Sequence, residues 1–367
     1  MKKTISLLVA FGLSITLCAC NAKDPENLLE TQAPTKTVQE EPSSPVVIEE
    51  GYYQYGNMQV SVPAGDFILY GDQVLFEVIP DGHSLLCTYD LSTGKVNTLC
   101  KDATCTHGSA CPSGGADCNL EQYQGKLYAR NYSRQITQFV DGRFEKITDG
   151  GVFCFWHANG NLYAVTDDHA LVVFENGSHT PRILIDEYAE HWNVVFGHYL
   201  YSGFGRCCRV DLSAENPQLE VLVEDADCKT DGRYIYYLDH KYYHLYRCNM
   251  DGSNPELLID QSVFTGSLNF DDEYLYFRLC KDEYELYGEG SNVLYRAPKS
   301  DPTQMEQIAQ LPEPIETVHT VPGYDLLFVG TIDLGECVDG FYPDAIRYNY
   351  VMHTDGSNMT HLELPDF

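Results

Sequence analysis

The sequence has few positive charges and few tryptophans. Lys and Arg together number 23 in 367 residues, against 54 Asp and Glu, so the formal net charge is −31, and there are two Trp. Nucleic-acid backbones are bound by Lys and Arg that displace counterions, so we expect no nucleic-acid partner. A solvated acidic surface of this kind keeps a protein soluble and monomeric, and a face for a cation or a basic partner is the alternative.

The sequence also lacks the local motifs of several enzyme classes. It contains no Gly-x-Ser-x-Gly elbow, no His-Glu-x-x-His, no P-loop and no dinucleotide fingerprint. Paired carboxylates drawn from different parts of a chain leave no local motif, so these absences do not exclude a glycosidase. We therefore expect a binding module for a protein or glycan, with a glycoside hydrolase or lyase acting on extracellular carbohydrate as the alternative.

Beyond the N-terminus no run of 18 apolar residues occurs, so no later segment is expected to span a membrane. The N-terminus itself has Lys2 and Lys3 followed by a short apolar stretch, which is typical of an export signal. That stretch ends in Leu17-Cys18-Ala19-Cys20, which resembles the lipobox of bacterial lipoproteins. The resemblance implies that residues 1–19 are removed, that Cys20 is lipidated, and that the protein is extracytoplasmic and anchored to the cell membrane. An ordinary secretory signal is the alternative.

Residues 20–50 are rich in Pro, Thr, Ser and Glu and poor in aromatic residues. Such a segment cannot bury enough apolar area to offset its ordering entropy. We predict a disordered acidic stalk between the lipid and a folded body over residues 51–367.

The body contains seven copies of one pattern, in which a turn precedes a short aromatic strand. Tyr (27) and Phe (16) are abundant, and such residues fill half-buried strands. The seven strands begin at Gln73, Lys126, Asn161, His198, Tyr234, Tyr274 and Asp325. The periodic spacing predicts a repeat fold.

Each copy continues into a second turn and a further strand. The same tetrapeptide, Asp-Gly-Ser-Asn, occurs at 251–254 and 355–358, and its residues supply the positive φ of tight hairpins. With a fourth strand from apolar residues such as Phe67–Tyr70, each copy becomes a four-stranded antiparallel meander. The fold class predicted is all-β, a single β-propeller with seven blades favoured and six or eight as alternatives. Residues 52–62 are expected to add a strand to the last blade, whose outer region is 359–364.

The segment 245–254 carries a resemblance at the level of family. Its sequence, LYRCNMDGSN, looks like the repeat of six-bladed propellers of the TolB-like and low-density-lipoprotein-receptor kind. Together with the lipobox, the stalk and the cysteine-rich segment, the chain resembles an uncharacterised family of propeller lipoproteins of Gram-positive anaerobes. The resemblance implies fold and location, and it implies no catalytic residue.

A cysteine-rich insertion at 100–118 interrupts the repeat between the first two copies. Its candidate cluster consists of Cys100, Cys105, His107, Cys111 and Cys118. Exported proteins keep disulfides, so two disulfides are one interpretation. Three thiolates and an imidazole also suit structural zinc, and free thiols are the third possibility. No cofactor is required by the fold.

Three connections are candidate binding loops. The first is a candidate because its carboxylates, histidine and tryptophan could line a carbohydrate-binding surface, with an ordinary blade connection as the alternative. The other two are candidates because long connections on a rigid scaffold often carry binding residues. The residues are Glu187, His191 and Trp192 in the first, Asp282, Glu283 and Glu285 in the second, and Asp333, Glu336 and Asp339 in the third. The acidic ones suit calcium, although their spacing is not that of an EF-hand. His240 and His244 are two further metal-ligand types, but they lie in a predicted hairpin rather than on a helix face.

Overall fold

The computed structural model describes residues 67–78, 85–100, 102, 105, 107, 111–114, 116–188, 193–280, 290–321, 323–335 and 345–363. The predicted signal, the lipidation site Cys20, the stalk and the extra strand at 52–62 lie outside this part of the chain. Across the described part, no helix is long and apolar enough to cross a membrane.

Seven four-stranded antiparallel sheets make up the described structure, and each sheet takes its strands in chain order. The first four blades comprise β1 (Phe67–Tyr70), β2 (Gln73–Val78), β3 (Leu85–Asp90) and β4 (Val96–Thr98); β5 (Ala116–Tyr123), β6 (Lys126–Asn131), β7 (Ile136–Val140) and β8 (Arg143–Lys146); β9 (Val152–Ala158), β10 (Asn161–Thr166), β11 (Leu171–Phe174) and β12 (Arg182–Ile185); and β13 (Asn193–Phe196), β14 (Tyr199–Ser202), β15 (Cys207–Asp211) and β16 (Leu219–Val223).

The last three blades follow the same order. They comprise β17 (Ala226–Thr230), β18 (Tyr234–Asp239), β19 (Leu245–Asn249) and β20 (Glu256–Ile259); β21 (Asn269–Phe270), β22 (Tyr274–Phe277), β23 (Val293–Pro298) and β24 (Glu306–Gln310); and β25 (Ile315–Thr320), β26 (Leu327–Asp333), β27 (Ile346–Met352) and β28 (Thr360–His361). Within the described residues, two 3-10 turns, η2 (Glu175–Gly177) and η3 (Thr265–Ser267), join strands.

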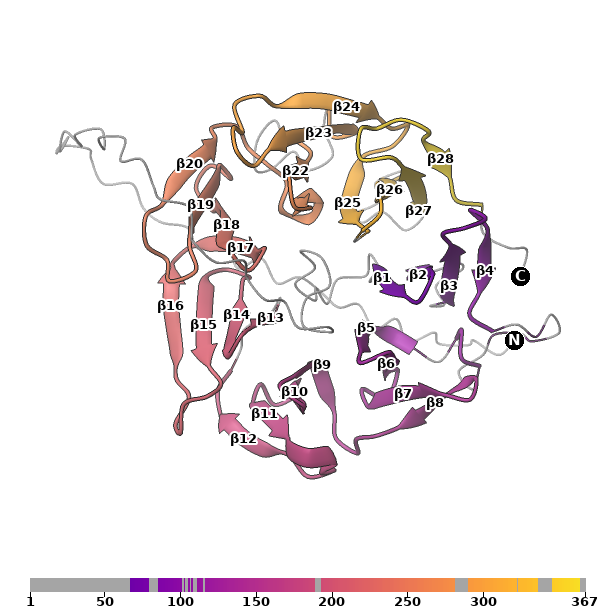
Figure 1. Cartoon of the computed structure of the whole chain (residues 1–367), viewed down its shortest axis with the longest axis vertical. Coiled ribbons are helices and arrows are strands. Elements are labelled where there is room, and N and C mark those ends of the chain that lie inside the picture. The colour runs from indigo at the N-terminus through magenta and orange to yellow at the C-terminus, as the bar shows by residue number, and fades with distance from the viewer. Residues whose placement is uncertain are drawn as a thin grey trace, which may run out of the picture. The chain divides into compact units, whose positions relative to one another are not determined.

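The sheets form a ring, with the first strand of each blade nearest the centre and the fourth at the rim (Figure 1). This confirms the prediction of a seven-bladed propeller. The seven aromatic strands of the repeat are the second strands of the blades, and Phe67–Tyr70 is the first strand of blade one. The last blade takes all four strands from residues 315–361, and its outermost strand, β28, lies within the predicted outer region.

The hydrophobic core is divided among the junctions between neighbouring blades. Seven buried clusters occur in the described structure, and each draws residues from two adjacent blades. The cluster that closes the ring packs Phe76 of blade one with Phe328 of blade seven, both fully buried. A single blade cannot cover its own faces, so the ring is held by burial at every junction.

The identical Asp-Gly-Ser-Asn turns have a packing reason as well as a conformational one. The Asp251 carboxylate accepts hydrogen bonds from the Ser253 amide (3.0 Å) and hydroxyl (2.5 Å). Gly252 and Gly356 have φ of +79° and +82°, where glycine is favoured. A Cβ on Gly356 would also lie 2.0 Å from the Ile308 carbonyl oxygen on the outer strand of the preceding blade. The glycine therefore lets the turn pack against its neighbour.

A repeated arrangement of Tyr, Arg and Glu, which we call the arginine clasp, links blades four to seven. In blade five, Arg247 lies 4.6 Å from the centre of the Tyr234 ring, pairs with Glu256 at 2.6 Å, and donates to the Lys299 carbonyl of blade six at 3.3 Å. The equivalent sets are Tyr199, Arg209, Glu220 and Met250, and Tyr274, Arg296, Glu306 and Thr354. The Leu-Tyr-Arg motif of the sequence thus supplies a contact between blades.

The antiparallel order divides the connections between two faces of the ring. Connections from second to third strands, and from each fourth strand to the next blade, open on one face, which we call the long-loop face. Connections from first to second and from third to fourth strands open on the other, which we call the tight-turn face. Asp-Gly-Ser-Asn turns belong to the tight-turn face. The cysteine insertion and all three candidate binding loops begin and end on the long-loop face.

Candidate functional site

The cysteine insertion connects β4 of blade one to β5 of blade two. Its first residue, Leu99, packs against the buried cluster that blades one and two share. Backbone hydrogen bonds then fix its far end to blade one, since the Leu86 amide of β3 donates to the Ser113 carbonyl at 2.7 Å. The Ser113 hydroxyl accepts from the Cys100 amide at 2.5 Å, which joins the two ends of the segment.

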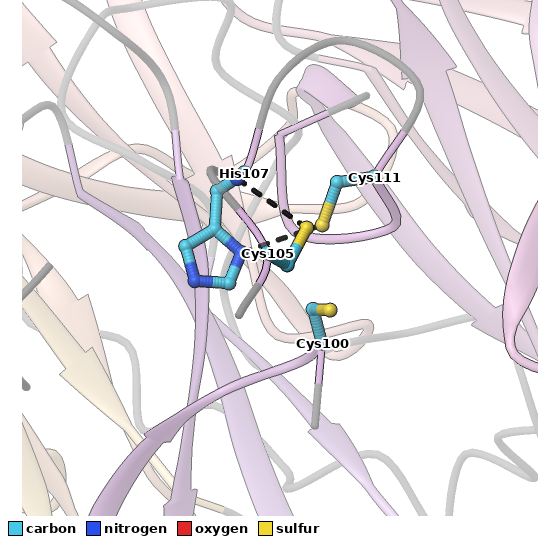
Figure 2. Close-up of side chains that lie close together, drawn as sticks. All are labelled: Cys100, Cys105, His107 and Cys111. Atoms are coloured by element: carbon cyan, nitrogen blue, oxygen red, sulfur yellow. Dashed lines mark hydrogen bonds between the residues drawn. The ribbon is translucent and has the colours of Figure 1, made fainter. Parts of the chain in front are cut away.

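Four of the five predicted cluster residues converge within this loop (Figure 2). The Sγ atoms of Cys100, Cys105 and Cys111 and a ring nitrogen of His107 all lie within 4.8 Å of one another. The His107 Nδ1 atom is 3.4 Å from the Cys111 Sγ atom. Cys111 is buried and the other three residues are half-buried.

Backbone amides point at two of the sulfur atoms. The His107 amide donates to Cys105 Sγ and the Ser113 amide to Cys111 Sγ, each at 3.4 Å. The first of these contacts is the largest cause that lowers the pKa of Cys105. Burial raises the pKa of Cys111 to about 11. The two thiols therefore differ in how readily each loses its proton.

Cys100, Cys105 and Cys111 are free thiols in the structure, and the choice between disulfides, zinc and free thiols stays a prediction. Cys118 lies in β5 rather than in the loop. Its side chain is not among those that the structure describes. The insertion is therefore shorter than the predicted 100–118, because strand β5 begins at Ala116. The residues that converge span 100–111.

Two of the predicted binding-loop residues fall in the described structure. Glu187 is exposed in the connection between β12 and β13, beside the fully buried Tyr188. Asp333 is exposed at the end of β26 and accepts a hydrogen bond from the Gly335 amide at 3.1 Å. The remaining candidates lie outside the described residues, namely His191, Trp192, Asp282, Glu283, Glu285, Glu336 and Asp339.

The two histidines of blade five have different neighbours. His240 Nε2 is 3.1 Å from an Asp227 carboxylate oxygen, and this hydrogen bond raises the pKa of His240. His244 instead stacks on the Tyr242 ring, with centroids 5.3 Å apart. Each of the two histidines therefore has a contact of its own, with an aspartate for His240 and with a tyrosine ring for His244.

Polar side chains buried on the innermost strands were not predicted from the sequence. Glu121 of β5 accepts hydrogen bonds at 2.6 Å from both the amide and Nδ1 of His157 on the next blade. Lys229 of β17 donates to the Leu268 carbonyl, and burial lowers its pKa to about 8. These contacts join residues more than 30 positions apart, so no local pattern could show them.

The acidic side chains described on the innermost strands are all engaged by the protein itself. Glu121 is held by His157, Asp227 by His240, and Glu316 by Arg347 at 2.7 Å. Glycosidases need one carboxyl group to hold a transferable proton and a second to act as nucleophile or base. Each of these carboxylates is thus already paired with a histidine or an arginine, and this arrangement gives the glycosidase interpretation no support.

Comparisons with known proteins define the class of the fold and no family. No protein-family model matches the sequence, and a search of curated proteins finds no match. Among solved structures, a puromycin-hydrolysing peptidase of Mycobacterium tuberculosis is similar with a TM-score of 0.55 and 12% identity, over 88% of this chain and 58% of that one. One from a study of two prolyl endopeptidases has a TM-score of 0.53 and 10% identity, over 85% and 52%.

This chain therefore spans about half the length of the peptidases it resembles. At such low identity the likeness shows the fold alone. The chain is a β-propeller, and its seven blades differ in number from the six of TolB-like propellers. The resemblance to propeller lipoproteins remains a prediction.

Proposed function

We propose that this protein is an extracytoplasmic lipoprotein, anchored through lipidated Cys20, whose propeller binds an extracellular protein or glycan through its long-loop face. The observation that supports the binding role most directly is the division of the ring. Its long, unrepeated connections gather on one face, while the repeated tight turns occupy the other. Binding residues commonly lie on loops that a rigid scaffold positions. No metal or cofactor is needed for this role.

The anchor is tested by substituting Cys20→Ala in the full chain. Wild-type protein is expected in the membrane fraction and labelled by a fatty-acid analogue, whereas the variant should lose the label and leave that fraction. Equal labelling of both proteins would contradict the lipoprotein proposal. The lipobox pattern Leu17-Cys18-Ala19-Cys20 is the feature that supports this expectation.

The binding role is tested on arrays of cell-surface glycans and purified surface proteins. A ligand found there should bind more weakly to variants of the long-loop face, such as Glu187→Lys and Asp333→Lys. Matched substitutions on the tight-turn face, Glu215→Lys and Asp272→Lys, change acidic residues that are also exposed and should leave affinity unchanged. Equal loss from both faces would contradict the assignment, and turnover of a glycan on the array would favour the enzyme alternative.

A further inference from the structure

The cysteine insertion brings four potential metal donors to one point. Three thiols and one imidazole, drawn from 12 consecutive positions (100–111), have donor atoms within 4.8 Å of one another. Figure 2 shows the four side chains gathered in one place. Cysteines placed for packing alone would not require the histidine nitrogen to face the same point.

The separations suit a tetrahedral site. Zinc binds thiolate sulfur at about 2.3 Å and histidine nitrogen at about 2.0–2.1 Å, so two donors of one tetrahedron lie about 3.6–3.8 Å apart. The 3.4 Å between His107 Nδ1 and Cys111 Sγ is close to this value, and the 4.8 Å limit on all pairs leaves only small movements for closure.

The surroundings of the sulfurs also suit bound thiolates. The amides of His107 and Ser113 donate to Cys105 Sγ and Cys111 Sγ, and hydrogen bonds of this kind stabilise the charged form of a ligand and orient it. The Cys100 backbone is held on both sides, because its amide donates to Ser113 and its carbonyl accepts from the Thr98 hydroxyl at 2.5 Å. The donors are thus positioned by the protein before any metal arrives.

A disulfide accounts for fewer of these features. One disulfide joins two sulfurs at about 2.05 Å and leaves the third thiol and the imidazole without a role. A four-donor site uses all four side chains. Three soft thiolates with one imidazole select zinc over calcium or magnesium, which prefer oxygen.

We propose that Cys100, Cys105, His107 and Cys111 bind one zinc ion in a closed structural site. All four coordination positions are filled by the protein, so the ion has no open position for a substrate. Its effect is to fold the connection between blades one and two against β3, where the Leu86 amide already contacts Ser113. The site therefore gives the long-loop face a rigid element, and this inference does not depend on which partner that face binds.

The test is metal analysis of the purified full chain, isolated in the presence of a non-thiol reductant. We expect about one zinc per chain. Variants Cys105→Ser, Cys111→Ser and His107→Gln should each lose most of it. Cobalt exchanged into the wild-type protein should show the visible absorption of tetrahedral thiolate coordination.

Three matched controls accompany these variants. Cys118→Ser changes the cysteine of β5 that follows the loop, Cys280→Ser changes a half-buried cysteine far away in the sequence, and His361→Gln changes an exposed histidine. All three should keep their zinc. Loss of zinc in Cys118→Ser with retention in His107→Gln would overturn the ligand set.

Two further outcomes would overturn the site. One is the absence of tightly bound zinc after the reduced wild-type protein is offered Zn²⁺. The other is a disulfide among Cys100, Cys105 and Cys111, found by peptide mapping of metal-free protein isolated without reductant. Iron in place of zinc would overturn the choice of metal. If a variant fails to fold, chelation of the wild-type protein and reloading with zinc still decide the question, because they need no substitution.

Discussion

The Asp-Gly-Ser-Asn turns and the cysteine insertion are both polar, glycine-containing connections, yet their side chains are directed differently. In the turn, Asp251 is satisfied by Ser253 within the same four residues, and the glycine permits contact with the neighbouring blade. In the insertion, four donors converge on one another instead. The comparison teaches that repeated polar residues build the ring, and that unrepeated residues which converge mark a site.

The largest loss of stability is expected when a buried contact between two blades is removed. Phe328→Ala deletes a fully buried ring from the cluster between blades seven and one. We expect a loss of about 3–5 kcal/mol in the free energy of unfolding, measured with denaturant. Leu257→Ala truncates a side chain that is 47% exposed and should change stability much less. Similar losses from both would contradict a core located at the blade junctions.

Acid should weaken the ring through a histidine that the sequence did not single out. Burial, with the nearby charge of Lys229, lowers the pKa of His319 to about 3. Because the unfolded histidine binds a proton near pH 6.5 and the folded one does not, the free energy of unfolding is fully retained above pH 6.5 and falls as the pH drops towards 3. The slope from one such group is at most about 1.4 kcal/mol per pH unit.

The histidine's contribution is measured by unfolding His319→Gln across this pH range. The variant should lose part of the slope between pH 6.5 and 4, whereas the exposed control His361→Gln should keep the wild-type slope. An unchanged slope in His319→Gln would show that other groups account for the acid sensitivity.

The glycine of the repeated turn provides a closely matched pair. Gly356→Ala places a Cβ against the Ile308 carbonyl oxygen at a φ of +82°, whereas Gly142→Ala meets nothing within 4 Å at +83°. The left-handed backbone costs about 1–2 kcal/mol in both variants, and crowding adds about 1–3 kcal/mol in the first. The Tm of Gly356→Ala should therefore lie well below the Tm of Gly142→Ala. Equal Tm values would show that packing against the neighbouring blade is not a reason for this glycine.

A smaller effect is expected at the arginine clasp. Arg247→Ala removes a contact with the Tyr234 ring, an ion pair and a hydrogen bond to the next blade, which together contribute about 1–2 kcal/mol. Arg143→Ala removes only an exposed pair with Glu145, for which about 0–1 kcal/mol is typical. Denaturant unfolding of both variants checks the difference, and equal losses would show that the clasp does not link blades.

Much of the fold could be predicted from the sequence because each blade repeats the same local pattern of a turn followed by an aromatic strand. The turn before Tyr234 is held by Asp231, whose carboxylate accepts from the Arg233 and Tyr234 amides at 2.9 Å, and this local chemistry is visible in the residues themselves. The number of blades followed from counting the strands that such turns precede.

The contacts between blades could not be predicted in the same way. Glu121 meets His157, and Arg247 meets the Lys299 carbonyl, only when neighbouring blades pack together. The cysteine cluster was predicted as a set because its members are close in sequence. Whether these residues form disulfides or bind a metal depends on where their side chains point, and the sequence alone does not show that direction.

Hydrogen–deuterium exchange of the full chain with zinc bound and after chelation tests the central claim most directly, because it reads the cysteine insertion and the blades in one experiment. We predict that zinc slows exchange in residues 99–115 and at the Leu86 amide, and that β17 to β24 in blades five and six exchange equally in both states. A change spread through all blades, or none in the insertion, would contradict the separation between the repeated ring and a zinc site built on it.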